Sequence, residues 1–159
     1  MMLFLLALCM GMVSGLRAMT APAAVSWAAK LGSLRLDNTW LAFLGYDWTP
    51  WILTVLALGE LVADQLPSTP SRTVPVQFGA RLASGALSGA AVGAADGSLL
   101  MGGMAGALGA VIGTFGGRST RAQLAKALGS DTPGALIEDA TAILAAVLIL
   151  ATIPLAQFA

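Results

Sequence analysis

Residues 1–29 form an apolar run in which Arg17 is the only charged side chain. A run of this length and character is typical of a helix that crosses a membrane. A charge at that depth is costly in hydrocarbon, so Arg17 requires an acidic partner or a water-filled cavity. The chain must therefore fold so that other segments bring polar groups to Arg17.

The residues around Arg17 also predict a break in the helix. Pro22 has no backbone N–H, and inside a helix its ring would crowd the carbonyl of Ala18. Gly15 supplies flexibility before the charge, and Thr20 is able to cap a new helix that has Pro22 in its first turn. We therefore expect one half-helix to end near Arg17 and another to begin at Thr20. The alternative is one proline-kinked helix whose Arg17 side chain reaches the membrane interface.

Composition extends the membrane prediction to the whole chain. Of the 159 residues, 57% are hydrophobic and 10% are charged, whereas soluble domains carry about 25% charged residues. Long runs of low charge follow one another at about 2–29, 49–66, 76–95, 99–115 and 134–158. We predict an all-α, polytopic membrane helix bundle of about five spans, which forms a single integral membrane domain over residues 1–159 in contact with the lipid bilayer.

Two connections between these runs carry clear signals. Three prolines with Ser and Thr between them predict a loop over residues 66–75. Aromatic and polar residues mix over residues 30–51, which is typical of a membrane interface, and we expect a short helix there over residues 40–44.

Basic residues in the loops predict the orientation of the bundle. With five spans, four basic residues share a side with the N-terminus, namely Arg72, Arg118, Arg121 and Lys126. Two others, Lys30 and Arg35, lie on the opposite side. Because cytoplasmic loops carry an excess of Lys and Arg, we expect a bacterial inner membrane protein with a cytoplasmic N-terminus and an external C-terminus.

Two Gly-x-Arg motifs predict an internal repeat. Residues 15–17 and 116–118 each end a glycine-bearing apolar run, and each is followed by a hydroxyl residue and later by two carboxylates. We therefore expect a second helix break at Arg118 and a candidate inverted-topology repeat, with binding sites where its halves meet. The two halves and the linking span cover about 1–66, 99–158 and 76–95.

Glycines spaced four apart recur in the third and fourth segments, as in Gly85-x-x-x-Gly89 and Gly102-x-x-x-Gly106. This spacing lets membrane helices approach closely. It indicates either tight packing inside one chain or the seam of a homodimer.

Three stretches together resemble one protein family. They are Gly-Leu-Arg-Ala-Met-Thr-Ala-Pro-Ala from residue 15, Gly-Glu-Leu-Val-Ala-Asp-Gln-Leu-Pro-Ser-Thr-Pro-Ser-Arg from residue 59, and Ile-Glu-Asp-Ala from residue 137. With them the chain resembles the small bacterial integral membrane proteins that are grouped as a domain of unknown function in the four-thousand series. The resemblance covers essentially the whole chain. It implies a membrane protein and supplies no activity, substrate or catalytic residue.

The charged and hydroxyl residues near the two Gly-x-Arg motifs form the candidate substrate-binding site. A guanidinium beside the free N–H groups of a new helix favours an anion or a phosphate-bearing ligand. The carboxylates would either neutralise the arginines and give a rigid scaffold, or bind Na⁺ or carry a proton. The candidate residues are Arg17, Thr20, Glu60, Asp64, Arg118, Ser119, Glu138 and Asp139.

Three function classes follow from these residues. We expect a small-solute or ion transporter or channel; the alternatives are the handling of lipid-phosphate head groups, as in a flippase, and a non-catalytic scaffold or partner subunit. The chain has no histidine and a net charge of zero, which argues against imidazole metal sites and gives no case for nucleic acid. Because no Ser/His or Cys/His set and no phosphate loop occurs, we expect no catalytic residues, no cofactor and no metal.

Overall fold

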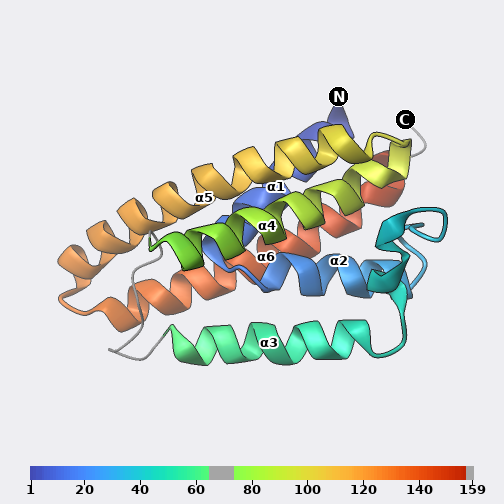
Figure 1. Ribbon diagram of the computed structural model, residues 1–159. Coiled ribbons are helices and arrows are strands. Elements are labelled where there is room, and N and C mark those ends of the chain that lie inside the picture. Colours follow the sequence, from blue (N-terminus) through green and yellow to red (C-terminus); the bar gives the residue numbers. More distant parts are fainter. Residues whose placement is uncertain (65–73, 157–159) are drawn as a thin grey trace.

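The computed structural model describes residues 1–64 and 74–156, and over these residues it contains helices and no strands, which confirms the all-α class (Figure 1). The predicted loop over residues 66–75 lies almost entirely outside the described residues. The 3₁₀ turn at residues 40–45 matches the short helix expected near the aromatic residues. The elements are α1 (Met2–Leu16), α2 (Thr20–Lys30), η1 (Trp40–Gly45), α3 (Thr49–Ala63), α4 (Pro75–Gly93), η2 (Ala94–Asp96), α5 (Leu99–Leu128) and α6 (Asp131–Ala156).

The break that the sequence predicts in the first segment is confirmed. Arg17 has extended backbone angles, φ −139° and ψ 112°, between the end of α1 and the start of α2. Pro22 is the third residue of α2 and lies in the first turn, where a missing N–H removes no helical hydrogen bond. The expected cap is wrong, because Met19 occupies the cap position without a side-chain hydrogen bond and Thr20 is already helical.

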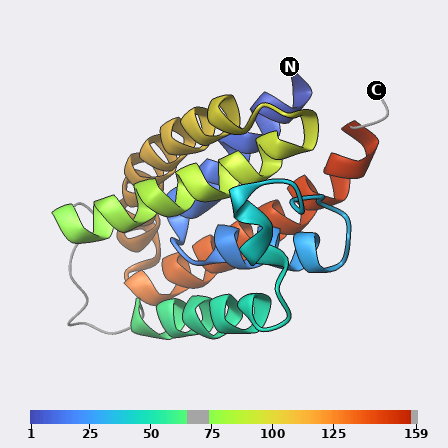
Figure 2. The same cartoon turned by 45° about the vertical axis from the view of Figure 1, so that its right-hand side comes forward.

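The chain reverses direction at this break. In Figure 1, α1 runs from the N label toward the middle of the bundle, and α2 returns toward the end from which α1 came. The helices then alternate in direction, so that the start of α1 and the end of α6 lie at the same end of the bundle (Figures 1 and 2). The first segment is therefore a helical hairpin and not a single broken span.

The second predicted break, at Arg118, is wrong. α5 continues through residues 116–118 to Leu128, and its C-cap residue, Gly129, has a left-handed φ of 67°. No proline follows Arg118 before the end of α5, and residues 122–128 are mostly good helix formers, so nothing local stops the helix.

The helix directions also do not support the inverted repeat. Such a repeat would make α1 and α5 run in opposite directions. Instead they run in the same direction, because Gly11 lies against Gly106 and Gly15 lies against Gly113, further along both helices.

Glycines determine how closely α1, α4 and α5 pack. A Cβ atom built at Gly106 would lie 2.1 Å from the carbonyl oxygen of Gly85 in α4. A Cβ atom built at Gly11 of α1 would lie 2.0 Å from the carbonyl oxygen of Gly106. α1 and α4 therefore both pack against the same part of α5, at a distance that only glycine permits. These glycine faces pack against one another inside the chain, and the homodimer stays a prediction.

Two helices in the described part of the chain are long and apolar enough to cross a membrane, over Leu99–Leu128 and Asp131–Ile153. The 15 residues of α1 reach about 22 Å, which is less than the hydrocarbon thickness of about 30 Å. Large apolar side chains are exposed on α3, α5 and α6, for example Leu58, Ile112 and Leu144. These features favour membrane association, and they do not establish five spans.

We expect Gly106→Ala to lower the free energy of unfolding in detergent by about 1–3 kcal/mol, because the added methyl group would overlap backbone atoms of α4. Gly59→Ala in α3 is the matched control, since its Cβ would meet no atom within 4 Å. The control should gain up to about 1 kcal/mol from helix propensity. Equal stability of the two variants would contradict the packing described.

Candidate functional site

Arg17 lies at the centre of a cluster of charged side chains from several helices. It is fully buried, and its guanidinium contacts Asp64 at the end of α3 and Asp139 in α6. A buried charge without partners would cost several kcal/mol, so these two carboxylates make the burial of Arg17 tolerable. The prediction that Arg17 meets a carboxylate is confirmed.

Glu60 of α3 caps the start of α2. Its two carboxylate oxygens accept hydrogen bonds from the backbone N–H groups of Ala18 and Met19, both at 2.7 Å. N–H groups at the start of a helix have no partner within the helix and attract negative charge. The cap that the sequence analysis assigned to Thr20 is therefore supplied by another helix.

Arg81 of α4 binds the end of α1. Its Nη1 atom donates hydrogen bonds to the carbonyl oxygens of Gly15 and Leu16, at 2.8 and 2.5 Å. Its Nη2 atom lies 3.6 Å from Glu60 and 4.0 Å from Asp64. Arg81 was not among the site residues predicted from the sequence. The signal that could have found it is the one that identified Arg17, a lone charge inside an apolar segment.

We call Arg17, Glu60, Asp64, Arg81 and Asp139 the inner cluster. The two arginine side chains are 0% and 2% exposed, whereas the three carboxylate side chains are 11–14% exposed. The carboxylates therefore lie between the arginines and the outside. When all five groups are ionised, three carboxylates face two guanidiniums, and the cluster carries a net charge of −1.

The second half of the predicted site is not assembled as expected. Arg118 and Ser119 are exposed on α5, and no ion pair joins Arg118 to another residue in the described ranges. Glu138 is buried and lies 3.8 Å from Arg121. Arg121 in turn binds Asp131 at 2.9 and 2.5 Å. The α5 arginine that faces α6 is therefore Arg121, one turn beyond the predicted one.

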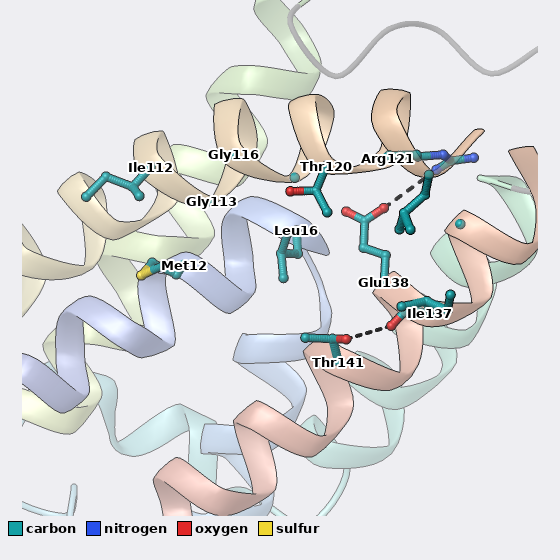
Figure 3. Close-up of a pocket in the computed structure, with 13 residues that line it drawn as sticks. Met12, Leu16, Ile112, Gly113, Gly116, Thr120, Arg121, Ile137, Glu138 and Thr141 are labelled. Atoms are coloured by element: carbon teal, nitrogen blue, oxygen red, sulfur yellow. Dashed lines mark hydrogen bonds and ion pairs between the residues drawn. The ribbon is translucent and has the colours of Figure 1, made fainter. Parts of the chain in front are cut away.

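A cavity of about 310 Å³ lies between α1, α5 and α6 (Figure 3), and we call it the glycine groove. Figure 3 shows Glu138 reaching from α6 toward Arg121 at one end, while Met12 and Ile112 lie at the other. The groove thus has an apolar part and a charged end. Its lining residues are Met12, Leu16, Ile112, Gly113, Gly116, Gly117, Thr120, Arg121, Leu124, Gly134, Ile137, Glu138 and Thr141.

Comparison with known proteins gives one match. The family model described as a domain of unknown function (DUF4126) matches residues 4–159, which confirms the family resemblance seen in the sequence. No curated protein and no solved structure matches the chain.

We expect Arg81→Met to lower the free energy of unfolding by about 3–5 kcal/mol, because it removes the donor of two carbonyl groups and a buried positive charge beside Glu60 and Asp64. Arg118→Met is the matched control on the exposed face of α5, and its effect should stay within about 0.5 kcal/mol. Chemical unfolding in detergent measures both. An equal loss of stability in the two variants would show that Arg81 does not stabilise the helix break at Arg17.

Proposed function

We propose that the chain, which belongs to the DUF4126 family, is an integral membrane protein that moves small anions, with the helix break at Arg17 as its anion site. One observation carries the proposal: Glu60 occupies the start of α2 as a bound anion would, with one oxygen on each of two backbone N–H groups at 2.7 Å. Helix N-termini and guanidinium groups are the donors that proteins use to bind anions.

In this proposal Glu60 is an internal occupant that an anion displaces. An incoming anion would meet the same N–H groups of Ala18 and Met19, with the guanidinium of Arg81 beside them. The Nε atom of Arg17 is buried and has no hydrogen-bond partner among the described residues, so it offers one more donor. The space to be filled is that of one carboxylate group, which favours small monovalent anions.

Charge balance couples this exchange to a proton. The inner cluster already carries one more carboxylate than guanidinium, so a further negative charge would be costly in a poorly solvated site. If Glu60 takes up a proton as it leaves the N–H groups, the total charge facing Arg17, Arg81, Asp64 and Asp139 does not change. We therefore expect one proton to move with each anion, and flux to rise as the pH falls.

Basic residues suggest how the bundle sits in the bilayer. The last turns of α5 carry Arg118, Arg121 and Lys126, and the opposite end of the bundle carries Lys30 and Arg35 among acidic residues. The excess of basic residues favours a cytoplasmic location for the α5–α6 turn. The start of α1 would then face outside, contrary to the sequence expectation, because that expectation assumed five spans. The bacterial inner membrane stays a prediction.

A membrane scaffold is the second candidate function. The ion pairs of Arg17 with Asp64 and Asp139 join three parts of the chain without any ligand. A scaffold needs only the stability that these contacts provide, whereas a transporter also needs Glu60 to move.

We expect Glu60→Ala to increase the flux of chloride or fluoride from liposomes and to remove its dependence on pH, because the N–H groups of Ala18 and Met19 become available without a proton. Ion-selective electrodes at acidic and at neutral pH measure the flux. Arg17→Ala should abolish it, and lysine at this position should restore it only in part, because an ammonium lacks the guanidinium's planar fork.

Glu60→Gln separates transport from scaffold, since it keeps the size of the side chain and cannot carry a proton. If the protein transports anions, the Glu60→Gln variant should fold, and its anion flux should no longer respond to pH. If the Glu60 variants lose thermal stability while folded protein shows no anion flux under any condition, the scaffold function replaces the proposal.

A further inference from the structure

The glycine groove ends one residue away from the inner cluster. Leu16 of α1 lines the groove, and the next residue, Arg17, is the buried centre of the cluster. The same relation holds on α6, where Glu138 lines the groove and the next residue, Asp139, contacts Arg17. Neither Arg17 nor Asp139 lines the groove. The groove and the inner cluster are therefore adjacent but separate.

Leu16 lies at the boundary between them. Its side chain lines the groove and, in the view of Figure 3, lies between Thr120 of α5 and Thr141 of α6. Its backbone carbonyl belongs to the other side, because it accepts a hydrogen bond from the Nη1 atom of Arg81 at 2.5 Å. An apolar side chain at the end of α1 thus separates the groove from the charged groups behind it.

The groove is open at the surface and large enough to hold water. Four of the residues that line it are exposed on α5 and α6, namely Ile112, Gly116, Thr120 and Thr141. A Cβ atom built at Gly116 would meet no atom within 4 Å. The volume of about 310 Å³ corresponds to about ten water molecules, each of which takes about 30 Å³ in the liquid. A small anion therefore has room in the groove to keep part of its hydration shell.

We propose that the glycine groove is the route by which anions reach the helix break, and that Leu16 is the gate of this route. The inference rests on the proposed anion transport and adds a residue to the path of the same anion. Hydrophobic constrictions in channels close the path to ions by excluding water. Leu16 in its present position keeps water in the groove away from the inner cluster.

The path has a defined beginning and end. It begins at the charged end of the groove, where Thr120 and Arg121 supply a hydroxyl and a guanidinium group as hydrogen-bond donors. Glu138 lies 3.8 Å from Arg121, so its carboxylate faces a positive charge there. Beyond Leu16 the path ends at the backbone N–H groups that Glu60 occupies.

Reversible cysteine modification in liposomes tests the gate, in a Cys9→Ser background because Cys9 is exposed. Leu16→Cys should react with a small anionic methanethiosulfonate that is present on both sides of the membrane. The adduct should stop chloride or fluoride flux, because it fills the gate. Dithiothreitol removes the adduct and should restore the flux, which a damaged fold would not allow. Ala122→Cys is the matched control, an exposed position of α5 outside the groove lining, and it should react without loss of flux.

Gly116→Leu tests the groove, because its side chain would enter the groove without striking the protein. Introduced into the Leu16→Cys protein, it should slow the modification and lower the flux. Gly79→Leu is the matched control, an exposed glycine of α4 that also has nothing within 4 Å of an added Cβ and lies outside the groove lining. Equal rates of modification in the two proteins would overturn the route through the groove.

The remaining outcomes separate the route from the transport proposal. If Leu16→Cys does not react, the groove holds no water, as expected when a lipid acyl chain fills it, and the route is overturned. Modification without loss of flux would overturn the gate and leave anion transport in place. If the unmodified protein carries no anion, the transport proposal itself fails, and the route fails with it.

Discussion

The burial of one guanidinium is the constraint on which the rest of this structure depends. Arg17 has no exposed surface, and two carboxylates from α3 and α6 meet it. Those helices must therefore lie against the break, and their position brings Glu60 onto the start of α2. Arg81 satisfies the carbonyl groups at the end of α1 in the same way. The two helix ends that a break exposes are thus each bound by a charge of the appropriate sign.

Close packing makes this arrangement possible. The backbones of α1, α4 and α5 approach within contact distance at Gly11, Gly85 and Gly106, one glycine from each helix. The helix break at the end of α1 therefore lies in the interior. The same lack of side chains that permits contact in one part of α5 leaves the glycine groove open in another. Gly106 is packed against two helices, whereas Gly116 faces open space. The glycines of α5 therefore produce both the tight core and a cavity at its edge.

The features that were predicted correctly from the sequence are those that depend on residues close together in the chain. Arg17 and Pro22 predicted the break because a charge and a missing N–H act on the backbone next to them. The direction of α2 depends on which distant groups receive Arg17, so no local pattern indicated the reversal. The break predicted at Arg118 is wrong because, unlike Arg17, Arg118 has no proline close behind it and is exposed. Arg81 carries the same signal as Arg17, a lone charge inside an apolar segment, but its binding to carbonyl groups of α1 cannot be predicted from the residues around it.

Reversal of the chain at Arg17 is the central claim, and side-specific cysteine labelling tests it directly. Cys9 is exposed and would be replaced first, in a Cys9→Ser background. Single cysteines, Met2→Cys and Ser33→Cys, then mark the exposed positions that flank the α1–α2 hairpin. A membrane-impermeant maleimide should reach both from the same side of intact vesicles. Labelling of the two positions from opposite sides would contradict the hairpin and restore a single broken span.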